Sequence, residues 1–246
     1  MYSIGIDVGS TFTKYCITTD GTITSLFMEK TVVRQQEYFE RKVAELLNKF
    51  PNAEIISCGY GKKNVDGLRN INELTALARG VYSITGKDGL VLDIGGQDTK
   101  IILQEEGKLK GFFINDKCAA GSGMFLTTIL NMVGMSFDDI KLRGYKENSI
   151  KLPSNCAVFA QSEIVELIAN NKTEDEIVQA VLKQIFLNAK PLLSKINPKP
   201  ILLSGGLSQI EGISEFASWV LGCECKIVSK GVFLAALGCT DCLRRI

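Results

Sequence analysis

The sequence contains no histidine among its 246 residues. This absence excludes nucleophilic sites of the Ser-His and Cys-His type and every metal site that needs an imidazole ligand. An excess of one charge is also lacking, because 28 lysines and arginines balance 27 aspartates and glutamates and leave a formal net charge of +1. The composition therefore argues against nucleic acid or an anionic membrane as the main partner.

Long apolar runs are lacking as well. Runs such as residues 89–92 and 232–237 fall far short of the roughly 18–20 apolar residues that span a bilayer. The N-terminal residues 1–6 have neither the basic segment nor the apolar stretch of a signal peptide. We therefore expect a cytoplasmic protein whose eight cysteines are buried thiols, metal ligands or redox groups rather than a disulfide framework.

An internal repeat organises the chain. Residues 5–14 (GIDVGSTFTK) align without gaps with residues 91–100 (VLDIGGQDTK), at a constant offset of 86 positions. In each copy a short strand stops at an Asp-x-Gly turn, a second strand follows, and a further turn leads into a third strand. The repeat predicts two lobes of like construction.

The lobe boundaries follow from this repeat. Lobe I is expected at residues 1–86 and lobe II at residues 87–229, and a C-terminal helix of about residues 230–246 is expected to pack back on lobe I. Small residues in that helix, among them Ala236 and Gly238, would permit a close crossing with another element.

Helices are expected between the strands, which indicates an α/β fold. An apolar stripe at residues 39–50 has helical spacing. Thr173 and Glu176 form a capping box that opens another helix, which Pro191 should kink or end. A later apolar strand leads through a Gly-Gly turn into a helix from about Ser208.

The two Asp-x-Gly turns have the composition of a phosphate cradle. Glycine at a turn lets backbone N–H groups face a ligand where a Cβ would obstruct it, and hydroxyl groups add donors. The residues concerned are Gly9, Ser10, Thr11, Thr13, Gly95, Gly96 and Thr99. A nucleotide phosphate suits such a cradle.

Asp7 and Asp93 end their strands, and we expect both to face one crevice. Paired carboxylates beside phosphates form a natural Mg²⁺ site, usually through water because Mg²⁺ dehydrates reluctantly. Lys14 or Lys100 would neutralise phosphate charge. The alternative is that each Asp-x-Gly is only a hairpin turn, but two copies in register favour a nucleotide site.

A series of motifs carries a family resemblance over nearly the whole chain. In order, they are GIDVGSTFTK at 5–14, GYG at 59–61, DIGGQDTK at 93–100, NDKCAAGSG at 115–123, CAVFAQSE at 156–163 and SGG at 204–206. With them the sequence resembles the activator, or component A, of the 2-hydroxyacyl-CoA dehydratases, a family that also includes the ATPase subunits of benzoyl-CoA reductase. It departs from this family at Leu77, where a histidine is common, and at Gln161, where a glutamate is common.

This resemblance implies a two-lobed α/β fold of the actin, Hsp70 and sugar-kinase superfamily, in which a ribonuclease H-like unit is duplicated. It implies that Asp7 and Asp93 position Mg²⁺ and the attacking water, with Gln97 and Asp98 as further candidates for the catalytic role. It assigns the phosphates and the adenosine of ATP or ADP to the remaining turn residues, namely Lys14 with the turn amides, and Gly205 with Gly206.

Two cysteines precede expected helices. Cys118 comes before a helical run at 124–132, and Cys156 opens another at 157–169, so each thiol should lie at a helix N-terminus, where the dipole favours a thiolate. From the residues alone, the two are either thiolate ligands or small buried hydrophobic residues. The resemblance implies that these cysteines from each of two subunits complete one [4Fe-4S] cluster. Because two ligands cannot hold a cubane alone, the protein would be a homodimer.

A rival set of thiolates has the pair spacings of zinc sites: Cys223 with Cys225, and Cys239 with Cys242. Against a metal role, the first pair is expected to lie along a strand. The second pair is expected in the apolar closing helix. Cys16 and Cys58 are expected in strands and carry no ligand pattern.

Together these features favour an ATP-hydrolysing activator that passes single electrons from a ferredoxin or flavodoxin to a dehydratase or reductase component. ATP is needed because the transfer is uphill. For a one-electron transfer, each tenfold change in the equilibrium constant corresponds to a difference of about 59 mV in reduction potential. The alternative is a small-molecule kinase of the sugar or pantothenate type on the same fold, followed by an actin-type filament protein. Neither alternative gives Cys118 and Cys156 a role.

Overall fold

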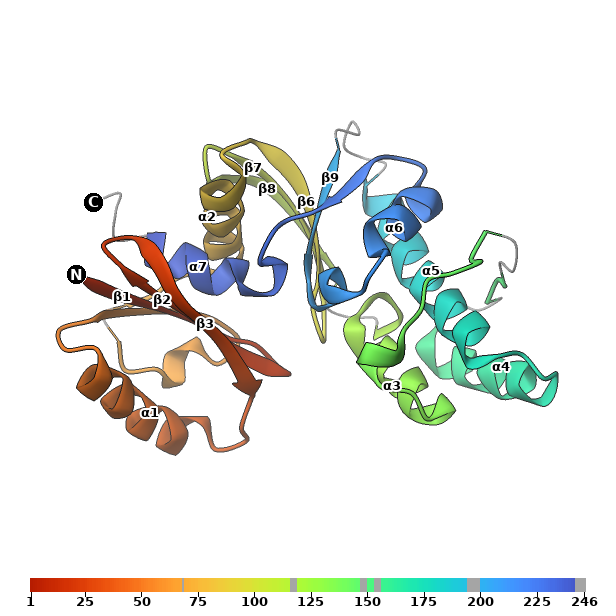
Figure 1. Cartoon of the computed structure of the whole chain (residues 1–246), viewed down its shortest axis with the longest axis horizontal. Coiled ribbons are helices and arrows are strands. Elements are labelled where there is room, and N and C mark those ends of the chain that lie inside the picture. The colour runs from red at the N-terminus through yellow and green to blue at the C-terminus, as the bar shows by residue number, and fades with distance from the viewer. Residues whose placement is uncertain (68, 116–118, 147–149, 153–155, 194–199, 242–246) are drawn as a thin grey trace. The chain divides into compact units, whose positions relative to one another are not determined.

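The computed structural model describes residues 1–67, 69–115, 119–146, 150–152, 156–193 and 200–241 of the chain. These residues fold into two compact units, and their strands form two five-stranded sheets (Figure 1). Unit 1 comprises Met1–Asp88, Ile102–Gly111 and the chain from Val228 onward, and unit 2 comprises Gly89–Ile101 and Phe112–Ile227.

The first sheet has the strand order β3-β2-β1-β4-β5. Its strands are β1 (Tyr2–Val8), β2 (Phe12–Thr19), β3 (Thr22–Lys30), β4 (Glu54–Gly59) and β5 (Arg69–Asn70). β2 is antiparallel to both β1 and β3, whereas β4 runs parallel to β1 and β5 runs parallel to β4. The parallel pairing brings the carboxyl ends of β1 and β4 to the same edge of the sheet.

The second sheet has the order β10-β9-β6-β7-β8. Its strands are β6 (Gly89–Ile94), β7 (Thr99–Glu105), β8 (Lys108–Asn115), β9 (Ile201–Gly205) and β10 (Cys225–Ile227). Counted from β8, this is the order of the first sheet, with β6 in the place of β1 and β9 in the place of β4. β9 runs parallel to β6, as β4 does to β1. The expected α/β fold is therefore confirmed, and the repeat seen over ten residues extends to five strands in each sheet.

The turns that connect the second and third strands of each sheet are alike. Asp20 and Gly21 have φ values of 48° and 79°, and Glu106 and Gly107 have φ values of 50° and 72°. Two successive left-handed residues form the tight hairpin turn whose twist matches that of the flanking strands. Both turns lie where the sequence predicts them.

Helices cover the two faces of the first sheet in Figure 1. α1 (Gln35–Lys49) packs Phe39 against the face that carries Tyr15, while α2 (Glu73–Thr85) and α7 (Leu234–Asp241) lie over the opposite face. Alternation along β2 explains this arrangement, because Cys16 points to the side opposite Tyr15 and packs against Ala236 of α7.

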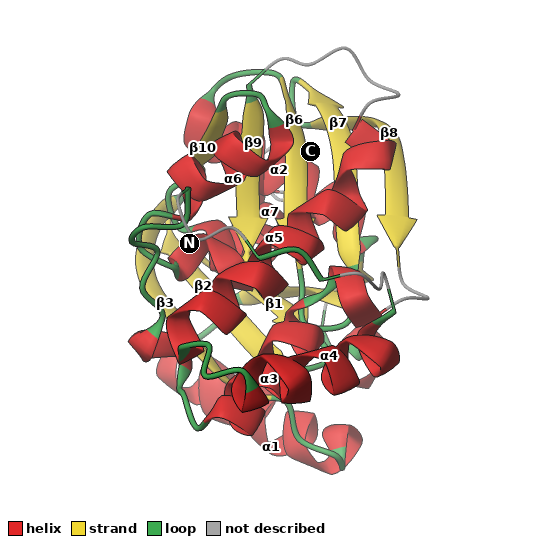
Figure 2. Cartoon of the chain, turned by 90° about the vertical axis from the view of Figure 1, so that its right-hand side faces the viewer, coloured by secondary structure: helices red, strands yellow, loops and turns green. Residues whose placement is uncertain are grey.

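The helices of unit 2 are α3 (Gly123–Val133), α4 (Ala157–Ala169), α5 (Glu174–Leu193) and α6 (Ile213–Leu221). Figure 2 shows α5 and α6 in front of the second sheet, and α5 buries residues such as Val181 and Ile185 in the same hydrophobic core as Leu92 and Ile94 of β6. Among the described helices, none is long and apolar enough to cross a membrane.

Some local predictions are confirmed and others are wrong. The predicted capping box starts α5, since the Thr173 N–H donates to Glu176 Oε2 at 3.0 Å, but α5 continues past Pro191 to Leu193. The helix expected from Ser208 is instead a short 3₁₀ turn, Gly206–Gln209, and α6 begins only at Ile213. Cys223 precedes β10, so of the pair expected along one strand only Cys225 lies in it.

α2 and α7 cross with their backbones in contact inside unit 1. A Cβ on Gly238 would lie 1.7 Å from the Ala76 carbonyl oxygen, and a Cβ on Gly80 would lie 1.8 Å from the Leu234 carbonyl oxygen. Backbone atoms cannot turn aside as a flexible side chain can, so both positions require glycine.

We predict that Gly238→Ala destabilises the protein by about 3 kcal/mol or more, the upper end of the range for overpacked cores, because the methyl group separates α2 from α7. Thermal or chemical unfolding measures this loss. The matched control is Gly111→Ala, where an added Cβ meets no atom within 4 Å, and its midpoint should stay close to that of the wild type. Equal midpoints for the two variants would contradict the prediction.

Candidate functional site

Asp7 occupies the end of β1 in unit 1, with 4% of its surface exposed. The β1–β2 register places Lys14 directly opposite, and the Lys14 ammonium donates to Asp7 Oδ2 at 3.0 Å. A buried carboxylate needs such a partner, because removing a charge from water without compensation is strongly unfavourable. The repeat motif therefore contains its own ion pair.

The turn between β1 and β2 exposes Ser10 and Thr11 to solvent. Gly9 is required there, since a Cβ would lie 2.8 Å from the Phe12 carbonyl oxygen and 3.0 Å from Lys14 Nζ. Thr13 is buried, and its hydroxyl lies 3.1 Å from the Thr31 hydroxyl, which donates in turn to the Gly9 carbonyl at 2.8 Å. Thr13 thus braces the turn from beneath, while Ser10 and Thr11 form its outer surface.

In unit 2, the buried Asp98 and Lys100 form a cluster with the half-buried Asp93. The Lys100 ammonium lies 2.6 Å from Asp98 Oδ1 and 3.8 Å from Asp93 Oδ2, and the three side chains are 6%, 5% and 13% exposed in the order Lys100, Asp98, Asp93. Two carboxylates share one ammonium group, which leaves an environment that favours an added cation. In the repeat alignment, Phe12 occupies the position of Asp98, so unit 1 lacks this second carboxylate.

The glycine turn after β6 is tied to the start of α3. The Gly95 N–H donates to the Asp98 carbonyl at 2.9 Å, and the N–H groups of Gly123 and Met124 donate to the carbonyls of Gly95 and Gly96, each at 2.8 Å. These bonds fix the turn as one rigid piece with the helix. The turn's carbonyls are therefore occupied by helix amides.

The other predicted residues of this turn differ in exposure. Gln97 is exposed, and its amide nitrogen lies 3.8 Å from the Met124 sulfur. Thr99 is buried, and its hydroxyl donates to the Gly121 carbonyl. Of the two, only Gln97 presents its side chain to solvent.

Gly205 and Gly206 follow β9, as the sequence indicates. Gly205 has φ of +83°, and a Cβ there would lie 2.3 Å from the Ile94 carbonyl oxygen, whereas a Cβ on Gly206 would meet no atom within 4 Å. Gly205 is therefore needed for the close approach of two strands. Gly206 leaves open space where a side chain would stand.

Two residues in contact with the aspartates were not predicted from the sequence. The Ser204 hydroxyl donates to Asp93 Oδ1 at 2.7 Å, and the Cys58 thiol donates to Asp7 Oδ1 at 3.8 Å. The sequence feature that could have identified both residues is their position at the end of an apolar strand, immediately before a glycine. It was missed because the repeat alignment covers β1, β2, β6 and β7 and stops short of β4 and β9.

Cys156 immediately precedes α4, and its carbonyl accepts a hydrogen bond from the Ala160 N–H at 2.9 Å. The expected position at a helix start is confirmed, and the residue is exposed. Cys118 and Cys242 lie outside the described residues. No group of three or more cysteine, aspartate or glutamate side chains within the described part of the chain is arranged to hold a metal ion.

Cys16, Cys58 and Cys225 are buried, whereas Cys156 is exposed. Burial raises the pKa of the Cys16 and Cys225 thiols to about 12. Burial, together with the neighbouring Cys239 thiol, raises the pKa of Cys58 well above its usual range. Because the thiolate is the nucleophile and the metal ligand, these buried cysteines are poorly suited to either role.

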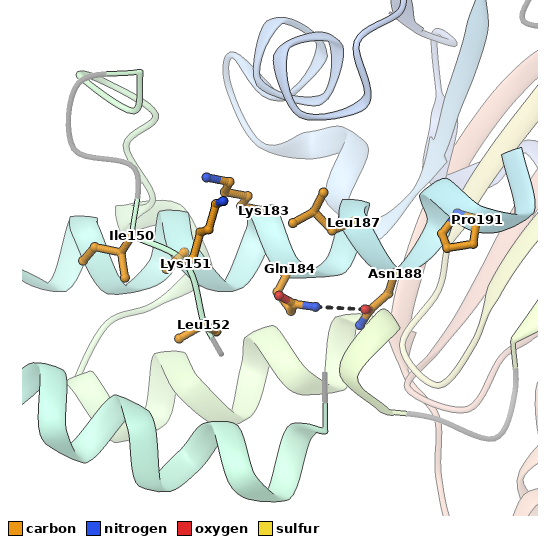
Figure 3. Close-up of a pocket in the computed structure, with 9 residues that line it drawn as sticks. Ile150, Lys151, Leu152, Lys183, Gln184, Leu187, Asn188 and Pro191 are labelled. Atoms are coloured by element: carbon orange, nitrogen blue, oxygen red, sulfur yellow. Dashed lines mark hydrogen bonds between the residues drawn. The ribbon is translucent and has the colours of Figure 1, made fainter. Parts of the chain in front are cut away.

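A cavity of about 350 Å³ lies in unit 2 between α5 and residues 150–152 (Figure 3). Gln184 and Asn188 in its wall are bonded to each other at 2.9 Å, and Asn188 also donates to the Ala120 carbonyl at 3.0 Å. The Lys183 ammonium lies over the Trp219 ring, 5.0 Å from its centre. None of the residues that line this cavity is a predicted site residue.

We predict that Cys156 reacts rapidly with a thiol reagent at pH 8 in metal-free protein, whereas Cys16 and Cys225 do not. A thiol of pKa about 12 is ionised to only about one part in ten thousand at that pH. Counting fast-reacting thiols by absorbance tests this. Cys156→Ser should lose one per chain, and Cys16→Ser and Cys225→Ser should lose none until denaturant is added. Loss of a fast thiol in Cys16→Ser would contradict the burial argument.

Comparison with known proteins relates the chain to one family of ATPases. Residues 4–227 match the model of the BadF/BadG/BcrA/BcrD ATPase family. An uncharacterised protein of Methanocaldococcus jannaschii is 36% identical over 211 residues, which cover 84% of this chain and 86% of the relative. The (R)-2-hydroxyglutaryl-CoA dehydratase activating ATPase of Acidaminococcus fermentans is 30% identical over 247 residues, covering 97% of this chain and 95% of the relative.

A solved structure extends the likeness to the fold. The activator of the 2-hydroxyisocaproyl-CoA dehydratase from Clostridium difficile, with bound ADPNP, superposes with a TM-score of 0.86 and 26% identity, over 100% of this chain and 98% of that one. The actin-like ATPase fold implied by the motifs is thus confirmed. The expected relationship to dehydratase activators is confirmed as well. The chain belongs to the BadF/BadG/BcrA/BcrD ATPase family.

Proposed function

We propose that this protein is an ATP-hydrolysing iron–sulfur activator that passes single electrons to a 2-hydroxyacyl-CoA dehydratase or a related CoA-substrate reductase. The observation that carries the proposal is the exposed Cys156 at the start of α4, in a chain whose two sheets have the same strand order and each end a central strand in an aspartate and a glycine turn. Relatives named as activators of CoA dehydratases support it.

In this proposal lobe I (1–86) and lobe II (87–229) act on one nucleotide. Asp7 and Asp93 bind Mg²⁺ through water and orient the attacking water, with Gln97 and Asp98 as further candidates for the latter role. The carboxylate oxygens are of the type that Mg²⁺ prefers. The other nucleotide contacts are assigned to the turns: Gly9, Ser10, Thr11, Lys14, Gly95 and Gly96 for the phosphates, with the buried Thr13 supporting the first turn from within, and Gly205 and Gly206 for the adenosine.

The cluster is assigned to Cys118 and Cys156 of each of two subunits. When bound, a [4Fe-4S] cluster supplies one-electron transfer at a low potential. The helix that Cys156 precedes is suited to a shared interface, because α4 exposes Phe159 (68%), Val165 (55%) and Ile168 (44%) along its length. Exposed apolar side chains of this size on one helix are suited to burial by a second subunit.

The electron donor in this proposal is a ferredoxin or flavodoxin, and the protein acts in the cytoplasm. ATP hydrolysis makes the uphill transfer favourable by changing the arrangement of the two units around the bound nucleotide. The competing assignment, a sugar or pantothenate-type kinase, differs in a measurable way: its phosphate would appear on an added acceptor rather than in water.

Asp7→Asn and Asp93→Asn should each lower Mg²⁺-dependent ATP hydrolysis by about 100-fold or more, because each variant loses a carboxylate near the metal without losing volume. Release of inorganic phosphate with and without Mg²⁺ measures the effect. Asp20→Asn is the matched control, since Asp20 lies on an exposed hairpin of unit 1, and it should hydrolyse ATP at the wild-type rate. Full turnover in both site variants would remove these aspartates from the mechanism.

Cys156→Ser should abolish the cluster in both subunits while leaving nucleotide binding intact, because its helix start is separate in sequence from the phosphate turns. Iron content and visible absorbance after anaerobic purification measure the cluster, and nucleotide affinity is measured in parallel. Cys225→Ser is the control, because its thiol is buried in unit 2. A Cys156→Ser protein that still holds four irons per dimer would transfer the ligand role to other cysteines.

A further inference from the structure

Each strand-end aspartate accepts a hydrogen bond from the parallel strand beside it. In unit 2, Ser204 pairs with Asp93 across β6 and β9, and its hydroxyl donates to Asp93 Oδ1 at 2.7 Å. In unit 1, Cys58 pairs with Asp7 across β1 and β4, and its thiol donates to Asp7 Oδ1 at 3.8 Å. The same oxygen of each carboxylate is therefore held by the residue at the same place in the sheet.

The residue that follows is equivalent too. Gly59 has φ of +88° and Gly205 has φ of +83°, and a Cβ would lie 2.5 Å from the Val8 carbonyl oxygen in the first case and 2.3 Å from the Ile94 carbonyl oxygen in the second. β4 and β9 therefore end in the same way against their partner strands. Cys58-Gly59 is the counterpart in unit 1 of the Ser204-Gly205 pair that opens the predicted adenosine turn.

The second oxygen of each carboxylate faces a lysine from the other neighbouring strand. Asp7 Oδ2 lies 3.0 Å from the Lys14 ammonium, and Asp93 Oδ2 lies 3.8 Å from the Lys100 ammonium. Each carboxylate is thus contacted on both oxygens, by a neutral hydrogen-bond donor on Oδ1 and by an ammonium group on Oδ2. A carboxylate has about four lone-pair positions, so these two contacts leave acceptor capacity for water bound to a metal.

The contacts that hold Asp93 differ in strength from those that hold Asp7. The O–H···O bond from Ser204 is short, whereas a thiol is a weak donor and its bond to Asp7 is long. For the ammonium groups the stronger contact is in unit 1, because Lys14 is close to Asp7 whereas Lys100 lies nearer to Asp98 than to Asp93. Asp93 therefore depends on its neutral donor more than Asp7 does.

We infer that Ser204 and Cys58 are positioning residues that hold the carboxylates of Asp93 and Asp7 in the orientation needed for Mg²⁺-dependent ATP hydrolysis, with Ser204 making the larger contribution. The inference rests on the proposed function, since it assigns these residues to that same nucleotide site. Neither residue needs to touch the nucleotide.

The test begins with Ser204→Ala, which removes the donor and little volume. Its kcat for ATP should fall about 10-fold, the scale expected for one hydrogen bond to a charged group. The KM for ATP should change by less than about threefold, and the Mg²⁺ concentration needed for half the maximal rate should rise, because a freely rotating carboxylate binds hydrated metal less well. A merely structural role would lower the unfolding midpoint without shifting the Mg²⁺ requirement.

Conservative variants sharpen the test. Ser204→Cys places the donor of unit 1 in unit 2 and should restore kcat part of the way from the alanine variant. Cys58→Ala should lower kcat by only about two- to threefold, consistent with a weak donor, and Cys58→Ser should match or exceed the wild type. If Ser204→Ala does not fold, Ser204→Cys is compared with the wild type instead. Equal values of kcat and of the Mg²⁺ requirement in these two proteins would overturn the larger contribution of Ser204.

Matched controls are available on the same sheets. Ser57→Ala removes a strand hydroxyl that is 1% exposed and bonds the Lys62 carbonyl, and Cys16→Ala removes a thiol that is fully buried on β2. Both should keep the wild-type Mg²⁺ requirement. A wild-type protein without Mg²⁺-dependent ATPase activity would overturn the proposed function. An active wild type together with an unchanged, folded Ser204→Ala would overturn the positioning role alone.

Discussion

A carboxylate removed from solvent at the end of a strand is the constraint on which the rest of each unit depends. Asp7 can be buried and Asp93 half-buried because a lysine on a neighbouring strand, Lys14 or Lys100, faces each of them. The donor on Oδ1 comes from the parallel neighbour on the other side. Three strands must therefore be in register at one point, which links the strand order of each sheet directly to the geometry of its site.

Close backbone approach is the second requirement, and glycine satisfies it at positions that a side chain would block. Gly59 and Gly205 let the parallel strand end against the carbonyl that follows the aspartate. On the far face of the first sheet, Gly5 lets α7 approach β1, since a Cβ there would lie 1.9 Å from the Ala236 carbonyl oxygen. β1 thus has the aspartate at its end and a helix against its face, so that packing and site geometry in unit 1 are determined together.

The part of this arrangement that could be predicted from the sequence is the part that repeats at a fixed spacing. Asp7 and Asp93 align at an offset of 86, which reveals β1, β2 and their counterparts, but Cys58 and Ser204 are 146 positions apart because α3, α4 and α5 are inserted before β9. No constant offset can find that pair. The 3₁₀ turn after Gly205 was missed for a local reason, since a left-handed residue at Gly212 delays the start of α6. Thr13 and Thr99 were expected beside a ligand, but in the structure both hydroxyls brace the turns internally.

The repeat also hides a difference between the two units that matters for the chemistry. Phe12 in unit 1 becomes Asp98 in unit 2, and Asp98 draws the Lys100 ammonium to 2.6 Å, leaving it 3.8 Å from Asp93. Asp7 keeps its ammonium at 3.0 Å. The charge of Asp93 is therefore the less compensated of the two, and a hydroxyl rather than a cation is its nearest partner. Within the proposed function, this makes unit 2 the side better suited to attract a divalent cation, while the closely paired Asp7 is better suited to orient a neutral water molecule.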